Sequence, residues 1–243
     1  MDEEDQKYSV ASKAVYSMYG KTPRTDRIAQ TQAVFDQHLP NSGYIIDSDL
    51  TNARRAVFKN DNTKDVIISH RGTQVSKNDL KDVKADINLF FGKHENTKRF
   101  QTAVDRDRED IERFKKEGYS VKLTGHSLGS TTAMMSSRAN NTKAVVFNGG
   151  GSAVGNTGFI LGSGFGGITG GILGSLIMPS SYQIKDSVGL LSKVEKRDKK
   201  NIKHYYVRTD PVSLTARKLP GKHKVIPRKK DLDPHTIENF IYV

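Results

Sequence analysis

Short apolar runs alternate with segments of helical periodicity along most of the chain. The longer runs have the length and the Val, Ile and Phe content of strands, at residues 65–69, 119–124, 143–147 and 202–208. Shorter strands are expected at 43–47 and 53–58. Apolar positions three or four apart predict helices over residues 8–20, 95–116 and 130–139. This alternation predicts an α/β fold, with a mostly parallel central sheet and helices on both faces.

A sharp turn between a strand and a helix is indicated by Gly125-His126-Ser127-Leu128-Gly129. The Gly-x-Ser-x-Gly pattern places a serine on a strained turn, and glycine is needed on either side because larger side chains would collide there. The bare pattern often arises by chance, but here an expected strand precedes it and an expected helix follows it. We therefore expect Ser127 to be a nucleophile, with the amino end of the helix beneath the reacting centre.

A nucleophilic serine needs a histidine as general base and a carboxylate that orients the histidine. Where the serine lies on a strand-to-helix turn of an α/β sheet, the carboxylate comes next along the chain and the histidine comes last. Asp210 comes directly after the apolar run 202–208, at the strand end where an α/β sheet places catalytic groups. The alternative is that Asp210 and the proline after it only make a turn. His223 and His235 are the downstream bases. His223 lies in a basic run that fits surface exposure, so we favour His235, at a loop-to-helix junction.

Two backbone amides are expected to form an oxyanion hole. One belongs to Leu128, the residue after the nucleophile. The other is expected from the loop after an earlier strand, where His70-Arg71-Gly72-Thr73 is well placed, and we assign it to Thr73. Losing one such donor typically costs about 3 kcal/mol of transition-state stabilisation. For the Arg71 side chain we expect a salt bridge beneath the sheet.

Together these segments resemble the class 3 lipases, the fungal-lipase-like α/β-hydrolases. The resemblance runs in order through the strand that ends in Arg-Gly-Thr, the Gly-His-Ser-Leu-Gly turn and the segments 86–88, 145–149, 154–156, 207–212 and 234–236. It implies one α/β-hydrolase domain over residues 1–243. It also implies that Asp210 is the catalytic aspartate, that His235 is the catalytic histidine and that Thr73 lines the oxyanion hole. This chemistry needs no cofactor and no metal.

Residues 153–178 form a glycine-rich apolar insertion between Ser127 and Asp210. The insertion has no charged residue, and glycine recurs at every fourth position from Gly158 to Gly174. Its 26 residues could span a bilayer, but one crossing would separate Ser127 from Asp210. We therefore expect a lid or a membrane-dipping hairpin, with a flexible glycine loop as the alternative.

The formal net charge of +12 is concentrated near the end of the chain. Residues 193–230 hold fourteen Lys or Arg and three Asp or Glu, a surplus of eleven. Such a run is usually a solvated face; the alternatives are an anionic membrane, which we favour as the partner, and nucleic acid, for which we find no recognition motif. The chain has no cysteine, and its acidic first residues are not those of a signal peptide. We expect a cytoplasmic or otherwise intracellular protein, peripherally bound to membranes; the oligomeric state stays open.

The sequence thus favours a serine hydrolase that cleaves carboxylic esters of lipids, acylglycerol or phospholipid, at a membrane surface. The alternative is a membrane-binding structural protein that keeps the lipase fold without activity. The retained order of serine, aspartate and histidine argues for the enzyme.

Overall fold

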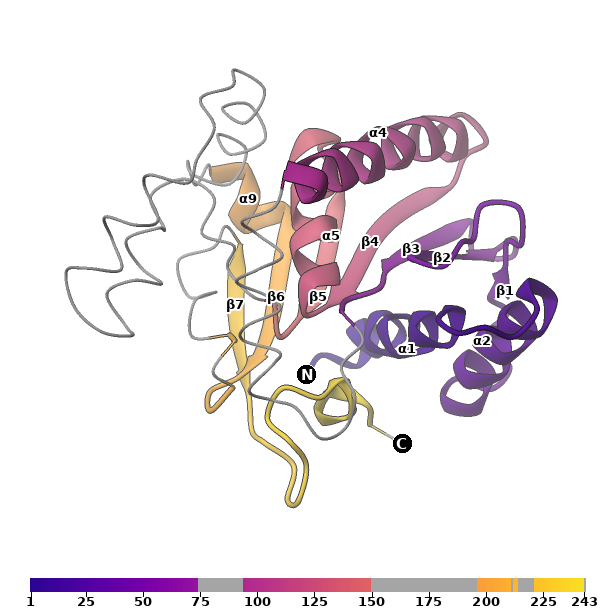
Figure 1. Cartoon of the computed structure of the whole chain (residues 1–243). Helices are drawn as coiled ribbons and strands as arrows, with labels where there is room; N and C mark the ends of the chain where they lie inside the picture. The colour runs from indigo at the N-terminus through magenta and orange to yellow at the C-terminus, as the bar shows by residue number, and fades with distance from the viewer. Residues whose placement is uncertain (74–93, 150–195, 211, 214–220, 243) are drawn as a thin grey trace.

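The computed structural model describes residues 1–73, 94–149, 196–210, 212–213 and 221–242 (Figure 1). The side chains of 94–99 and 196–198 are not included in that description. The glycine-rich insertion 153–178, for which we expect a lid or hairpin, and the polar segment 86–88 lie outside the described residues. Their structure therefore stays a prediction.

Within the described residues, seven strands form one sheet in chain order. The strands are β1 (Ile45–Ile46), β2 (Arg55–Asn60), β3 (Asp65–His70), β4 (Ser120–His126), β5 (Lys143–Phe147), β6 (Ile202–Val207) and β7 (Lys222–Ile226). The pairs β1–β2 and β2–β3 are antiparallel, and the strands β3 to β7 run parallel to one another. This mostly parallel sheet confirms the predicted α/β fold, and it brings the carboxyl ends of β3 to β7 to one edge.

Helices cover both faces of the sheet (Figure 1). They are α1 (Gln6–Ala14), α2 (Arg24–His38), α4 (His94–Lys116), α5 (Leu128–Ala139) and α9 (Lys196–Asn201), with the 3-10 helices η1 (Glu3–Asp5), η2 (Val15–Met18) and η4 (Ile237–Phe240). Successive parallel strands step in one direction, and right-handed crossovers then place α4 and α5 on the same face. The opposite face is covered by α1, α2 and η4.

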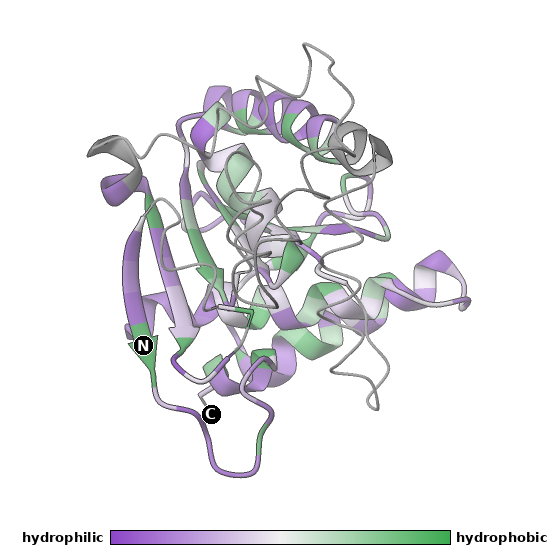
Figure 2. Cartoon of the chain, turned by 60° about the vertical axis from the view of Figure 1, so that its left-hand side comes forward, coloured by the Kyte–Doolittle hydropathy of each residue, from purple (hydrophilic) through white to green (hydrophobic). Residues whose placement is uncertain are grey.

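The two faces have separate apolar cores because neighbouring residues of a strand point to opposite sides. Ile67 and Phe147 pack with α1, α2 and η4, whereas Ile68 and Val146 pack with α4 and α5. Figure 2 shows the central strands as mostly apolar and the outer side of α4 as polar. No helix among the described residues is long and apolar enough to cross a bilayer.

A buried ionic cluster fastens α4 to the sheet. The Arg55 guanidinium lies 3.0 Å from Asp107 and also contacts Asp110, and His70 Nε2 lies 2.8 Å from the second Asp107 oxygen. Burial by itself raises the pKa of Asp107, but the facing His70 and Arg55 outweigh it, so the pKa lies below its ordinary value. The cluster joins α4, β2 and the end of β3, directly before the loop that starts at Arg71.

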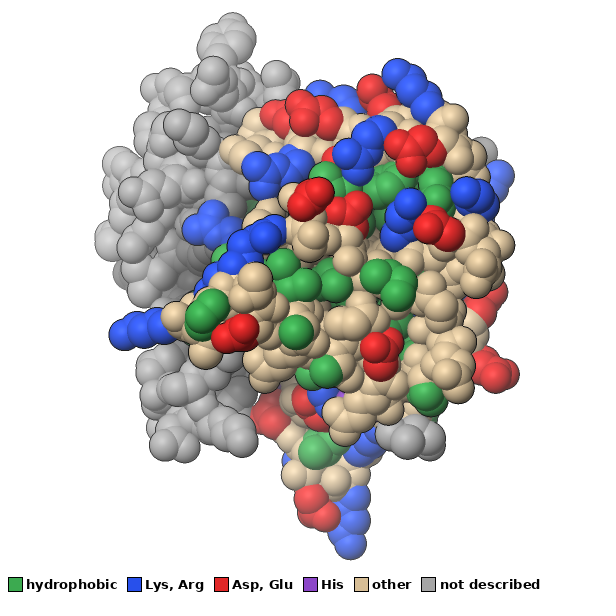
Figure 3. All heavy atoms as spheres, turned by 90° about the vertical axis from the view of Figure 1, so that its right-hand side faces the viewer, with side chains coloured by type: hydrophobic (Ala, Val, Ile, Leu, Met, Phe, Trp, Pro, Cys, Tyr) green, Lys and Arg blue, Asp and Glu red, His purple; other side chains and the backbone are tan. Residues whose placement is uncertain are grey.

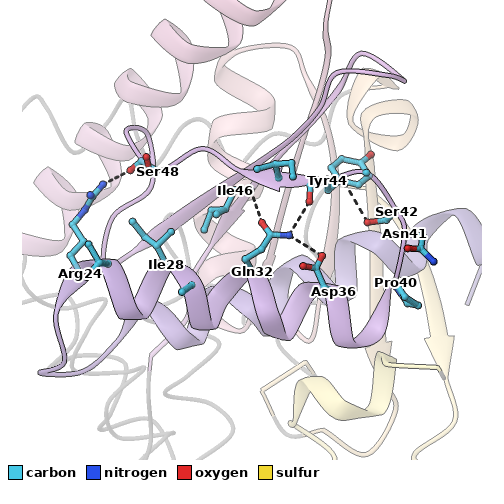
Figure 4. A pocket seen from close by; sticks show the side chains of 14 residues that line it. Arg24, Ile28, Gln32, Asp36, Pro40, Asn41, Ser42, Tyr44, Ile46 and Ser48 are labelled. Atoms are coloured by element: carbon cyan, nitrogen blue, oxygen red, sulfur yellow. Dashed lines mark hydrogen bonds between the residues drawn. The ribbon is translucent and has the colours of Figure 1, made fainter.

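The outer edge of β1 is occupied by the side chain of Gln32 from α2 (Figure 4). The Gln32 amide donates to the carbonyl oxygen of Tyr44 at 2.9 Å and accepts the Ile46 N–H at 2.7 Å, as a further strand would. A hollow of about 730 Å³ between α2 and β1 lies beside this contact. Figure 3 shows apolar side chains on this side of the molecule, with both signs of charge interspersed around them.

Several elements differ from the sequence prediction. Neither α2 nor β7 was expected, and the strand predicted at 43–47 contains only Ile45 and Ile46. The helix predicted at 8–20 is α1 followed by the 3-10 helix η2. His223, expected on the surface, is half-buried in β7, with its ring 5.3 Å from that of His204. The basic run around it forms a strand because its backbone pairs with β6.

Candidate active site

Ser127 stands on a strained turn at the carboxyl end of β4. Its backbone has φ 57° and ψ −126°, a conformation that residues other than glycine rarely adopt, and α5 begins at the next residue. A Cβ on Gly125 would lie 2.4 Å from the backbone of Gly129, and a Cβ on Gly129 would lie 2.1 Å from the carbonyl oxygen of His70. Both glycines are therefore required by backbone contact, as the Gly-x-Ser-x-Gly pattern predicts.

Ser127, His235 and Asp210 form one hydrogen-bonded series. His235 Nε2 lies 2.9 Å from the Ser127 hydroxyl oxygen, and His235 Nδ1 lies 3.0 Å from an Asp210 carboxylate oxygen. The two hydrogen bonds join residues 108 and 25 positions apart. In this geometry Nδ1–H donates to the carboxylate, which leaves Nε2 free to accept the serine proton. The structure thus brings together all three residues that the sequence analysis selected.

Asp210 is held in place by the turn that follows β6. It is fully buried, and its two carboxylate oxygens accept the N–H groups of Val212 at 3.0 Å and Ser213 at 3.2 Å. The Ser213 hydroxyl also donates to the oxygen that faces His235. A buried carboxylate with this many donors keeps one orientation.

Asn148, which the sequence analysis did not select, connects the loops that carry Asp210 and His235. It follows β5 in a left-handed conformation, with φ 42°, which asparagine tolerates. Its side-chain oxygen accepts the Val207 N–H at 3.0 Å and the Ser213 hydroxyl at 3.1 Å, and its amide donates to the Pro234 carbonyl at 2.8 Å. No sequence motif identifies this role, because it depends on three segments that meet only in the folded chain.

His126 supports His235 from beneath. Its Nε2 lies 2.7 Å from the His235 carbonyl oxygen, which can only accept, so Nε2 carries the proton. Its Nδ1 then accepts the Tyr16 hydroxyl at 2.9 Å. Burial, helped by the nearby His235, lowers the pKa of His126 to about 3, and the ring is neutral at physiological pH. The start of the chain thereby reaches the reacting centre through Tyr16.

The expected oxyanion residues adjoin the serine turn in different ways: Leu128 follows Ser127 directly, and Thr73 follows Gly72, which packs beside Ser127. Leu128 is the first residue of α5, and the first N–H groups of a helix have no acceptor within it. Gly72, directly before Thr73, is packed against the turn that carries Ser127. A Cβ on Gly72 would lie 2.5 Å from the Tyr16 hydroxyl and 2.6 Å from the His126 carbonyl oxygen. The Arg71 guanidinium lies over the Tyr19 ring, 4.6 Å from its centroid, and the salt bridge expected for it stays a prediction.

A second buried histidine lies near the end of β5. His204 Nε2 accepts the Gly149 N–H at 3.0 Å, and burial lowers the pKa of His204 to about 3.

Among the described residues, one group of side chains is close enough to hold a metal ion, the carboxylates of Asp2, Glu4 and Asp5. Lys203 forms ion pairs with all three, and they lie at the other edge of the sheet from Ser127.

Residues 7–156 match the family model of a Tle-like phospholipase domain, which is phospholipase-like. The match covers 150 of the 243 residues, including Ser127 and Thr73, and ends before Asp210 and His235. A search of curated proteins found no match. The match supports the predicted relation to lipases, although it is not specific to the class 3 lipases.

Proposed function

The chain belongs to the family of Tle-like phospholipase domains, and on that premise we propose that it is a serine hydrolase that cleaves ester bonds of phospholipids. The observation that carries the proposal is the hydrogen-bonded series from Ser127 through His235 to Asp210. This is the arrangement that activates a serine for attack on a carbonyl carbon. A lipid substrate follows from the family, and the residue roles rest on the geometry. The finer resemblance to class 3 lipases stays a prediction.

In the proposed reaction the Ser127 oxygen attacks the ester carbonyl while its proton passes to His235 Nε2. Asp210 stabilises the imidazolium that forms and keeps Nδ1 protonated. The tetrahedral oxyanion is held by the backbone N–H groups of Leu128 and Thr73. The imidazolium then gives its proton to the leaving alcohol, which departs and leaves an acyl group on Ser127. Water, deprotonated by His235, releases the fatty acid and restores the serine.

We place the reaction at a membrane surface because of the position of the carboxyl edge. Ser127 and Asp210 lie at this edge, and so does the loop after β7, which projects beyond the sheet in Figure 1. That loop carries the exposed side chains of Arg228 and Lys230. Basic side chains near an anionic membrane contribute about 1 kcal/mol each, so this edge would approach the lipid with the serine toward it.

The test is release of fatty acid from vesicles of phosphatidylcholine and phosphatidylglycerol by purified protein. Wild type should release fatty acid, and Ser127→Ala should lower the rate by about 10⁴-fold or more, because the nucleophile is lost. Asp210→Asn should lower it by a similar factor, about 10⁴-fold, because His235 then loses its correct tautomer. Ser120→Ala is the matched control, because Ser120 is the exposed first residue of β4, the strand that leads to Ser127. This variant should keep the wild-type rate.

The two parts of the proposal fail in different ways. Vesicle binding by wild type without release of fatty acid would overturn the hydrolase and favour the inactive membrane-binding protein. Equal activity on a soluble short-chain ester and on vesicles would keep the serine hydrolase and contradict action at a membrane surface.

A further inference from the structure

A basic hollow lies at the edge of the sheet opposite Ser127. It has a volume of about 490 Å³ and is formed where β4 to β7 begin, beside α9, which leads into β6 (Figure 1). Among the residues that the structure describes, seven lysines and two carboxylates line it. Four of these lysines come from the strands β4 to β7, one from each: Lys122, Lys143, Lys203 and Lys222.

The lysines of these strands are neighbours in the sheet. Lys122 pairs in register with Lys143, and Lys203 pairs in register with Lys222. Residues paired in register point to the same face of a sheet, and neighbouring strands are about 4.8 Å apart. Like charges placed directly opposite one another destabilise a sheet. The hollow is therefore lined with two adjacent pairs of like charges.

Carboxylates compensate only part of this charge. Asp65 lies 2.6 Å from Lys7 and 3.2 Å from Lys122, and Lys203 lies 2.5 Å from Asp5 and 3.1 Å from Asp2. The remaining lysines have no carboxylate within ion-pair distance among the described residues: Lys143, Lys199, Lys200 and Lys222. These four side chains are exposed around the hollow.

We propose that this hollow binds a compact anion with several phosphate groups. Its volume falls within the range of about 300–1,000 Å³ typical of small-molecule sites. Lysine is a common phosphate ligand, acting as a point charge. The buried side chains of Tyr8 and Val145, which belong to the core on the same face as the strand lysines, give the hollow an apolar floor. An anion that reaches Lys143, Lys222 and the two lysines of α9 would relieve the repulsion between the strands.

The position of the hollow decides between a free anion and a lipid headgroup. The seven residues of β4 separate its start from Ser127, and at about 3.3 Å a residue they span roughly 20 Å. A bilayer that supplied headgroups to the hollow would therefore lie against the opposite edge from the serine. We accordingly expect a soluble polyphosphorylated compound, and binding in the hollow is independent of the hydrolase activity proposed above.

The test is titration of the full chain with inorganic tripolyphosphate, followed by calorimetry at low salt. Wild type should bind saturably, and the double variant Lys143→Gln/Lys222→Gln should bind at least tenfold more weakly, because the two uncompensated strand lysines are lost. The matched control is Lys21→Gln/Lys116→Gln, which removes the same charge from exposed positions outside the hollow. The control should bind within twofold of wild type. Equal loss in both double variants, or no saturable binding by wild type, would overturn the proposal.

Thermal unfolding without ligand gives a second readout. The Lys143→Gln/Lys222→Gln variant should have a melting temperature equal to or above that of wild type, because like-charge repulsion is removed. A lower melting temperature would show that these lysines stabilise the sheet by themselves, which contradicts the proposed counterion. Tripolyphosphate should raise the melting temperature of wild type and of the control, and leave that of the double variant unchanged.

Vesicle sedimentation separates the two sources of phosphate. With phosphatidylglycerol vesicles, the Lys143→Gln/Lys222→Gln variant should sediment as wild type does, since the hollow faces away from the membrane. If this variant instead lost vesicle binding together with tripolyphosphate binding, the phosphate groups recognised by the hollow would be those of lipid headgroups.

Discussion

Asn148, at the end of β5, joins the end of β6 and the turn after it to the loop that carries His235. Its side chain contacts β6, the turn that orients Asp210 and the loop that carries His235. Ser127 is itself fixed by the backbone of β4 and α5, whereas its two partners are on loops. A side chain that bonds both loops therefore sets the distance between Asp210 and His235, although it touches neither of their reacting atoms.

At the residue scale we predict that Asn148→Ala lowers kcat by about 10- to 100-fold, because a shift of about 1 Å in a catalytic group can cost as much. The matched control is Asn141→Ala. Asn141 also has a positive φ, 45°, so alanine is strained equally there, but its side chain is exposed and, within the part of the chain that the structure describes, bonds only Asn201. Fatty-acid release under saturating lipid measures the effect. A similar fall in both variants would attribute it to backbone strain.

At the scale of elements, the ionic cluster under α4 holds together this helix, the strand β2 and the end of β3, which lies next to the Ser127 turn. Arg55 and His70 come from adjacent strands, and both contact Asp107 of α4. The His70 backbone packs against Gly129, two residues after Ser127, so the docking of α4 also affects the position of the turn that carries Ser127. Breaking one partner of a buried ion pair is costly because the remaining charge stays in a medium of low dielectric constant.

We predict that Asp107→Asn lowers the free energy of unfolding by about 3–5 kcal/mol. Asp105→Asn, on the same helix, should lower it by less than about 1 kcal/mol, because its ion pair with Arg108 is largely exposed. Urea denaturation at pH 7 compares the two. The interpretation fails if the two variants are equally stable.

At the scale of the whole molecule, the described residues of the basic run 193–230 do not form one surface. Lys199, Lys200, Lys203 and Lys222 lie at the amino edge of the sheet, whereas Arg228 and Lys230 follow β7 at the carboxyl edge. The run crosses the molecule because β6 and β7 each traverse the sheet. The charge surplus seen in the sequence thus serves two sites in our proposals, the phosphate hollow and the edge that faces the membrane.

Two buried neutral histidines also set the response of the whole fold to acid. Burial lowers the pKa of His126 and of His204 from 6.5 to about 3. As pH falls below about 6.5 the unfolded chain takes up protons that the folded chain does not. Their contribution to stability is therefore complete above pH 6.5 and is lost progressively from pH 6.5 toward pH 3.

We predict that the unfolding free energy falls by up to about 2.7 kcal/mol per pH unit below pH 6, about 1.4 for each histidine. Urea denaturation at pH 7.5, 6.0 and 5.0 measures the slope. In His204→Gln the slope should fall by about half, whatever the stability of the variant at pH 7.5. A stability that does not change between pH 7.5 and 5.0 would contradict the neutral state of both rings.

The sequence determined the features that depend on local rules. The strands β3, β4 and β5 are short apolar runs, and a buried strand is the structure that such runs favour. The need for glycine at Gly125 follows from contact with residues four and five positions along the chain. The positions of Asp210 and His235 followed from strand ends and chain order, and the structure brings both to Ser127. Their catalytic roles stay predictions.

The tertiary structure alone decided the features that depend on distant partners. The helix α2 was missed because its buried residues are few, Thr31 and Phe35, and β7 was missed because Lys-His-Lys-Val-Ile has no apolar run. Both are stabilised by neighbours that the sequence does not show. The same holds for Asn148, for Tyr16 beneath His126 and for the lysine pairs. Each acquires its role when strands align in register or loops meet, because hydrogen bonds and charge repulsion act over a few ångströms of space, whatever the separation along the chain.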